Sequence, residues 1–218
     1  MLLLKDKYIP KSFDEYTVNT CLKKYRKMFS KHNFGNTIIH GAEGSGKYNF
    51  ALCILNELYG DKIYKKRKCT IKYTSSSSAK EVELVCSNYH YEIYLNDYVL
   101  NNKSSLINII KELCKTKNIS TDFYKIIIIK NGEYISKENY GIFKTISETY
   151  YQTCKFIITF KNISKATTYF RGLFSFIRIP LPNEIELVSF LKDISFKECI
   201  CAKEKDLKEI VSQSKSNM

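Results

Sequence analysis

The sequence predicts an α/β fold in which a buried parallel sheet carries a phosphate-binding loop at the end of one strand. Two apolar β-branched runs, residues 125–129 and 155–159, are typical of strands that are buried on both faces. Segments with helical spacing separate such runs along the chain, as in sheets with helices on both sides. A glycine-rich segment, residues 41–47, stands between an apolar run and a helical pattern.

The glycine-rich segment, Gly41-Ala42-Glu43-Gly44-Ser45-Gly46-Lys47, has the composition of a phosphate-binding loop (P-loop). Glycines adopt positive φ and let backbone N–H groups approach a phosphate, while a helix N-terminus and Lys47 add positive charge. The residues expected to bind nucleotide are Gly41, Gly44, Ser45, Gly46, Lys47 and Tyr48. In the full motif a hydroxyl that holds Mg²⁺ follows the lysine, whereas Tyr48 and Asn49 follow it here. ATP or ADP is therefore the expected cofactor, without the usual magnesium ligand.

The other elements follow from apolar spacing and turn residues. Before the loop we expect a helix with Leu22, Tyr25, Met28 and Phe29 on one face, and after it a helix that stops at Gly60. Further strands are expected at 37–40, 68–74, 82–86, 89–93 and 176–179, with a turn at 75–78. Further helices are expected at 105–117, after a cap at Ser136, at 185–194 and at 203–212. Because only helices follow Pro182, we expect an α/β domain at 1–182 and a partial helical lid at 183–218.

The composition limits the kinds of partner. Thirty-five Lys and Arg against 22 Asp and Glu give a net charge of +13, which suits a polyanion or an acidic protein surface, although spread lysines also occur on ordinary solvated faces. The eight cysteines form no CxxC pair, so we expect buried reduced thiols and no zinc. No run approaches the roughly 18 apolar residues of a membrane span, which predicts a cytoplasmic or nuclear protein. His32, His40 and His90 have no Ser, Cys or acidic partner at a suggestive spacing and are expected to be structural.

Three segments together resemble one protein family. Residues 5–10, KDKYIP, resemble the opening of replication factor C small subunits, and CILNELYG at 53–60 and SNYHYEI at 87–93 resemble the branch of the human subunit 3. The resemblance implies an AAA+ protein with a P-loop α/β domain and a helical lid, followed by a collar that joins five subunits. Such complexes use ATP to load the sliding clamp onto primer-template DNA. The implied partners are therefore the other clamp-loader subunits, the sliding clamp and DNA, and the implied location is the nucleus or another DNA-containing compartment.

The chain departs from this family at several catalytic positions. The hydroxyl after Lys47 is missing, and Lys130 and Asn131 replace the acidic residues that hold magnesium and orient water. The sensor asparagine falls on Lys161, next to Asn162, and Leu173 stands at the arginine-finger position. Glu133 lies three residues too late to replace the carboxylate lost at Lys130, whereas the preceding arginine of the finger motif survives as Arg171, the expected inter-subunit residue. We therefore expect no catalytic residue, no metal ligand and a structural role within a complex.

The resemblance also predicts a DNA-facing surface at the start of the helix at 105–117, which in the family grips template phosphates. The expected phosphate contacts are Lys103, Ser104, Ser105 and Lys111. The usual arginine of this helix is Ile107 here, and an ordinary solvated helix end is the alternative.

Two other functions compete with the clamp-loader hypothesis. An active P-loop NTPase or small-molecule kinase needs the magnesium hydroxyl and an acidic base, and a generic basic nucleic-acid binder is supported by charge but by no reader motif. The family continues into its collar after a segment like 214–218, so we expect these 218 residues alone to be monomeric and to join partners weakly.

Overall fold

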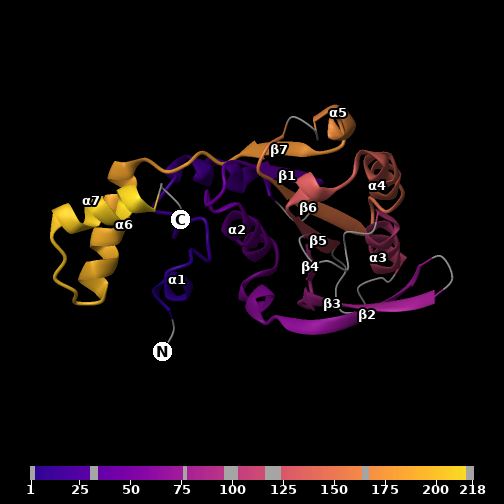
Figure 1. Cartoon of the computed structure of the whole chain (residues 1–218), viewed down its shortest axis with the longest axis horizontal. Helices are drawn as coiled ribbons and strands as arrows, with labels where there is room; N and C mark the ends of the chain where they lie inside the picture. Colours follow the sequence, from indigo (N-terminus) through magenta and orange to yellow (C-terminus); the bar gives the residue numbers. More distant parts are fainter. Residues whose placement is uncertain are drawn as a thin grey trace.

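The computed structural model describes residues 3–29, 34–75, 78–95, 103–115, 124–163 and 167–214 (Figure 1). Its sheet has seven strands in the order β2-β3-β4-β5-β6-β1-β7. The strands are β1 Thr37–His40, β2 Arg67–Ser75, β3 Ser78–Cys86, β4 His90–Tyr94, β5 Lys125–Lys130, β6 Cys154–Phe160 and β7 Ser175–Arg178. The α-helices are α1 Leu4–Lys7, α2 Lys47–Tyr59, α3 Lys103–Lys115, α4 Lys137–Thr149, α5 Thr167–Phe170, α6 Glu184–Lys197 and α7 Glu204–Gln213. Short 3-10 segments are η1 Thr20–Met28, η2 Asp61–Tyr64 and η4 Gly132–Tyr134.

The centre of the sheet is parallel, as the sequence predicts. Strands β4, β5, β6, β1 and β7 pair in parallel, and β5 and β6 are buried along almost their whole length. The edge formed by β2 and β3 differs, because these strands are antiparallel to each other and β3 is antiparallel to β4. Ser75 pairs with Ser78 across the end of the hairpin, so the connection is too short for a parallel crossover. This pairing agrees with the predicted turn at 75–78, whose central residues 76 and 77 lie outside the described residues.

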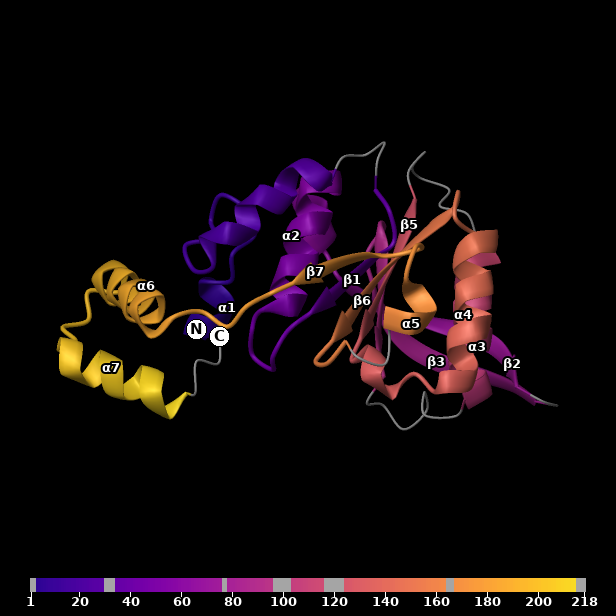
Figure 2. The same cartoon turned by 90° about the horizontal axis from the view of Figure 1, so that it is seen from above.

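Alternate residues of the central strands enter two cores on opposite faces of the sheet. Ile127 and Ile129 of β5 pack in a cluster with residues of α3 and α4. Ile126 and Ile128 pack on the other face, with α2 and the segment that precedes β1. Figure 2 shows α2 on one side of the sheet and α3 and α4 on the other. This arrangement confirms the predicted three-layer α/β fold.

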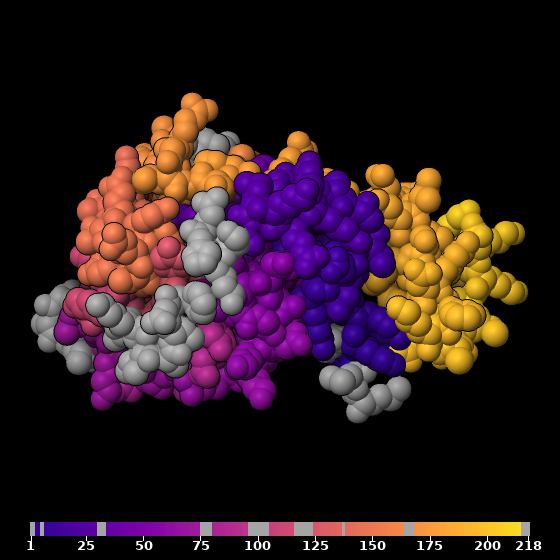
Figure 3. Space-filling model, turned by 180° about the vertical axis from the view of Figure 1, so that it is seen from behind, coloured from indigo at the N-terminus to yellow at the C-terminus, as the bar shows by residue number. Residues whose placement is uncertain are grey.

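The last two helices form a hairpin at one end of the molecule. Helices α6 and α7 confirm the predicted helical segments, and Leu187, Val188, Leu207 and Val211 form a small cluster between them. Val18, from the N-terminal segment, completes this cluster. Figure 3 shows the N-terminal segment, in indigo, between the hairpin and the rest of the molecule. No helix among the described residues is long and apolar enough to cross a membrane.

Three local predictions need correction. The helix before β1 is the 3-10 segment η1, and Met28 at its end is 46% exposed because Phe29 takes the buried place beyond it. Ser136 does precede α4, but its hydroxyl is buried and makes no cap hydrogen bond among the described residues. All eight cysteines are free, as expected, but three of them are exposed because they lie in the N-terminal segment and the turn between α6 and α7. These three are Cys21, Cys199 and Cys201.

Candidate functional site

The P-loop connects β1 to α2 at the carboxyl end of the parallel strands. Gly44 and Gly46 have φ of 74° and 78°, in the left-handed region that glycine adopts without strain. A Cβ atom at Gly41 would lie 2.3 Å from the carbonyl oxygen of Ile179, so only glycine allows the loop to pass this close to the residue that follows β7. The loop therefore has the geometry predicted for it, and its three glycines are needed where they stand.

The loop forms one wall of a cavity of about 380 Å³, a size typical of small-molecule sites. The lining residues are Glu43, Gly44, Gly46, Lys47, Tyr48, Asn49, Tyr94, Lys130, Asn131, Thr159 and Lys161. The first hydrogen bond of α2 runs from the N–H of Phe50 to the carbonyl of Gly46. The preceding N–H groups lie at the helix N-terminus outside this ladder, where they can donate to an anion.

Two loop side chains also suit a phosphate. Lys47 Nζ donates to the carbonyl oxygens of Gly41 at 2.9 Å and Ala42 at 2.5 Å, and burial lowers the pKa of this lysine. The Ser45 hydroxyl is buried and has no partner among the described residues. A bound phosphate would offer stronger, charge-assisted acceptors than these carbonyls. The P-loop residues therefore fit the phosphates of a nucleotide.

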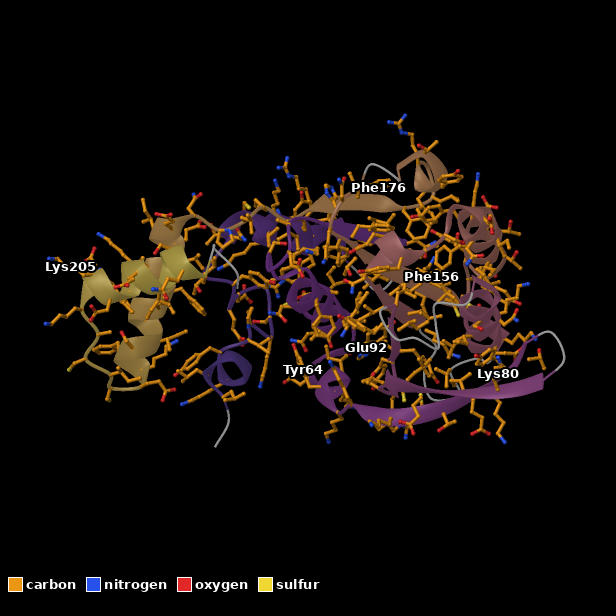
Figure 4. All side chains as sticks on the ribbon, in the orientation of Figure 1. Tyr64, Lys80, Glu92, Phe156, Phe176 and Lys205 are labelled. Carbon is orange, nitrogen blue, oxygen red and sulfur yellow. The ribbon has the colours of Figure 1, made fainter. Side chains whose placement is uncertain are left out.

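A buried polar cluster around Glu92 lies directly behind this cavity. Glu92, on β4, is 7% exposed, and Figure 4 shows it inside the body of the molecule. Its carboxylate lies 2.8 Å from Lys66 Nζ and 2.9 Å from Lys130 Nζ, and the Tyr48 hydroxyl donates to it at 2.8 Å. His90 Nε2 is 3.2 Å from the same carboxylate. We call these five residues the Glu92 cluster.

The Glu92 cluster is incompatible with the magnesium site of an active P-loop enzyme. Lys130, at the position where the family resemblance predicts a metal-binding acid, has its ammonium 3.5 Å from the centre of the Tyr48 ring. Tyr48, directly after Lys47, turns its hydroxyl to Glu92 rather than offering a small side chain to a cation. No group of three or more potential metal ligands occurs in the described part of the chain. The residues present do not fit Mg²⁺, because a cation beside Lys130 would be repelled.

The remaining predicted catalytic positions are engaged in other contacts. Lys161 pairs with Glu43 at 3.0 Å, and its backbone N–H donates to Glu133. Leu173 packs against the core on the α3 and α4 side of the sheet, while Arg171 is exposed, as an inter-subunit contact requires.

The predicted DNA-contact residues all belong to α3. Lys111 is exposed, and Lys103 and Ser104 stand at the start of the helix, with side chains outside the described part of the structure. Ser105 is 1% exposed, so a contact from this residue would use its backbone N–H rather than its hydroxyl. Ile107 is a core residue.

Sequence reasoning missed the main feature of the site, which is Glu92. It treated His90 as lacking partners, whereas His90 contacts Ser87 at 2.7 Å as well as Glu92. His90 is still a structural histidine, as expected, and His32 lies outside the described residues. The available signal was Lys130 itself, because a lysine at the end of a buried strand needs a carboxylate on a neighbouring strand.

Comparisons with known proteins first define the fold class. A RuvB variant of Thermotoga maritima superposes with a TM-score of 0.65 at 14% identity, covering 96% of this chain and 61% of that one. A second RuvB variant gives a TM-score of 0.62 at 12% identity, covering 95% and 61%. At this identity the likeness shows the fold alone, which is the P-loop α/β fold of AAA+ ATPases. No family model matches the chain.

The curated relatives of this chain are named as replication factor C subunits. A protein of Acanthamoeba polyphaga mimivirus, named as a replication factor C small subunit, is 28% identical over 98% of this chain and 59% of its own length. Replication factor C subunit 5 of Saccharomyces cerevisiae is 25% identical over 100% of this chain and 65% of its own length. Subunit 3 of Mus musculus is 25% identical over 91% and 57%. The predicted resemblance to replication factor C small subunits is confirmed, and the chain spans about three fifths of these relatives.

Proposed function

We propose that this chain is a noncatalytic subunit of a replication factor C-like clamp loader, which acts in DNA replication and repair. Its similarity to replication factor C small subunits supports the clamp-loader part of the proposal. The observation that carries the noncatalytic part is the Glu92 cluster, which puts Lys130 and Tyr48 where a magnesium site would be. In this proposal the subunit works with the other loader subunits, the sliding clamp and primer-template DNA, in the nucleus or another DNA-containing compartment. Arg171 contacts a neighbouring subunit.

The chemistry of phosphoryl transfer explains why hydrolysis is not expected. The metal ion and the residues around it stabilise charge in the transition state, and each such group is typically worth on the order of 3 kcal/mol. Here the hydroxyl after Lys47 and both acidic positions are replaced, and Leu173 packs inward at the position of the finger. ATP or ADP can still occupy the loop, because the phosphate-binding groups are intact.

Two experiments test the two parts of the proposal. The purified chain is expected to show no magnesium-dependent ATP turnover above that of a Lys47→Ala control. Turnover that this substitution abolishes would contradict the noncatalytic role. Affinity capture of the tagged chain from its native cell, followed by mass spectrometry, is expected to recover other clamp-loader subunits. Recovery of none of them would contradict the clamp-loader role.

We also propose that the start of α3 faces DNA within the loader. Lys103, Ser104, Ser105 and Lys111 would contact phosphates without reading sequence. Replacing both lysines by alanine is expected to reduce the log-log salt slope of DNA binding by the assembled complex, by up to about two units. The matched control is Lys68→Ala with Lys72→Ala on β2, both of whose side chains are 80% exposed. Equal slopes for the two double variants would rule out this surface.

A further inference from the structure

We propose that the P-loop cavity binds the polyphosphate of a nucleotide without a metal ion, and that Lys130 supplies the positive charge that Mg²⁺ supplies in related sites. This inference rests on the proposed nucleotide binding and specifies its ligand as free ADP or ATP rather than the magnesium complex.

The charges that line the cavity support a metal-free anion. Lys47, Lys130 and Lys161 line it, and among the described lining residues Glu43 is the one carboxylate. Glu43 is exposed and already pairs with Lys161. Lys47 makes no ion pair with a described residue, although Glu133 and Glu43 lie near enough to support its charge. Lys130 pairs with Glu92, which does not line the cavity. A polyphosphate would bring further negative charge to both lysines.

The Glu92 cluster holds Lys130 in place without cancelling its charge. Glu92 contacts Lys130 at 2.9 Å and Lys66 at 2.8 Å, so two ammonium groups share one carboxylate and one positive charge is left over. Lys130 lines the cavity and Lys66 does not. The excess charge is therefore presented to the cavity, next to the loop that binds phosphate. The Tyr48 ring, 3.5 Å from Lys130 Nζ, restricts the ammonium further.

A fixed cation at this point selects between the two forms of the nucleotide. Mg²⁺ bound to ATP or ADP removes two negative charges from the ligand and brings a cation toward Lys130, where the partly buried setting screens repulsion poorly. Free nucleotide keeps its full negative charge and can accept charge-assisted hydrogen bonds from Lys130 and Lys47. The site thus favours the metal-free form, opposite to a site that uses magnesium to hold the phosphates.

Isothermal titration calorimetry of the 218-residue chain with ADP and with ATP tests this preference. Each nucleotide is titrated once in EDTA and once with magnesium chloride in excess over nucleotide. Binding is expected in EDTA, with an affinity several-fold lower in excess magnesium. An affinity that rises with magnesium, or no binding in EDTA, would overturn the proposal. This comparison needs no substitution and so does not depend on how variants fold.

Three variants locate the effect. Lys130→Gln is expected to weaken metal-free binding about tenfold, the scale of one charge-assisted hydrogen bond. Lys66→Gln removes the positive charge that the Glu92 cluster has in excess but keeps Lys130 in the cavity, so it is expected to weaken metal-free binding less than Lys130→Gln does. Lys65→Gln, on the exposed neighbouring residue, removes an equal charge outside the Glu92 cluster and should change nothing. A loss for Lys65→Gln equal to that for Lys130→Gln, or no loss for Lys130→Gln, would overturn the assignment of the effect to Lys130. Thermal melting confirms that each variant is folded.

The outcomes separate this inference from the proposed function. Capture of clamp-loader subunits together with magnesium-dependent binding would leave the subunit role standing and remove the metal-free site. Metal-free binding without any captured subunit would support the metal-free site and contradict the clamp-loader role.

Discussion

Glu92 is a buried carboxylate that remains charged because of its neighbours. Burial alone would raise its pKa, but the hydrogen bond from His90 and the charges of Lys130 and Lys66 hold the pKa of Glu92 well below its usual range. The contacts that fix Lys130 at the cavity are thus the same contacts that stabilise Glu92. The cluster is a structural element as well as part of the proposed site.

Removing the charge of Glu92 should therefore destabilise the fold. Glu92→Gln leaves Lys66 and Lys130 without their carboxylate, and such a break in a buried ion pair typically costs about 3 to 5 kcal/mol. Urea unfolding at pH 7 measures this loss. The control is Glu83→Gln on β3, whose ion pair with Lys68 is exposed and should cost less than about 1 kcal/mol. Because the folded pKa of Glu92 is below the unfolded value, the difference from wild type should shrink as the pH falls below about 4. Equal losses at Glu92 and Glu83 would contradict the buried charge.

Lys155 shows the opposite case, a buried lysine that pairs with no carboxylate among the described residues. It is 1% exposed, its Nζ lies 3.0 Å from the centre of the Tyr151 ring, and desolvation lowers its pKa to about 8. Between pH 8 and 10.5 the unfolded chain holds a proton here that the folded chain lacks, so this residue makes stability rise with pH over that window.

Lys155→Met should remove this pH dependence. At pH 7 the variant avoids burying an ammonium and should be more stable than wild type by on the order of 2 kcal/mol, a difference that narrows toward pH 10. Urea unfolding at pH 7, 8.5 and 10 checks the trend. Lys144→Met, on the exposed face of α4, should leave the pH profile unchanged. A constant difference across the three pH values would show that the gain is packing and not charge.

At the scale of elements, the turn after β5 packs so closely on β6 that it leaves no room for a side chain at Gly132. A Cβ atom at Gly132, in η4, would lie 2.6 Å from the Phe160 ring and 2.7 Å from Ile158, both of them core residues. Gly132→Ala should therefore cost about 1 to 3 kcal/mol through overpacking. Gly141 lies inside α4 with nothing within 4 Å of an added Cβ, so Gly141→Ala should stabilise by about 0.5 to 1 kcal/mol. Thermal unfolding of the two variants should thus give shifts of opposite sign, and a shared sign would contradict the packing at Gly132.

The contrast between elements and site shows what sequence can predict. Strands β5 and β6 were predictable because each is a continuous apolar run, and the P-loop because its glycines serve a local backbone geometry. The hydrogen bond from Tyr48 to Glu92 joins residues 44 positions apart, and it exists only because α2 packs on the sheet beside β4. The partners of Glu92 include Lys66, which directly precedes β2, and Lys130 at the end of β5. No local sequence pattern indicates that these distant residues meet. The loss of the metal ligands could therefore be predicted from the sequence, but the Glu92 cluster that takes their place could not.

At the scale of the whole molecule, the N-terminal segment joins the helical hairpin to the α/β body. The Tyr8 hydroxyl donates to Glu198 at 2.6 Å, and Lys7 pairs with the same carboxylate. Val18 is 2% exposed and supplies the apolar contact between the N-terminal segment and the hairpin. The other buried residues of this cluster all belong to α6 or α7. The two parts of the chain on either side of the expected boundary at Pro182 are therefore held together by side-chain contacts from the N-terminal segment, in addition to the chain that connects β7 to α6.

Val18→Ala should loosen the hairpin and spare the sheet. The substitution removes two methyl groups from a small cluster, which should cost about 1 to 2 kcal/mol of local stability. If α6 and α7 form a separate cooperative unit, amide hydrogen exchange in residues 184–213 should become faster, while amides of β5 and β6 keep their protection. Val85→Ala on β3, where the side chain is 37% exposed, is the control and should leave the hairpin unchanged. If exchange becomes equally faster in the hairpin and in β5 and β6, the substitution at Val18 destabilises the whole fold. The chain would then unfold as one cooperative unit, which would contradict the proposed boundary.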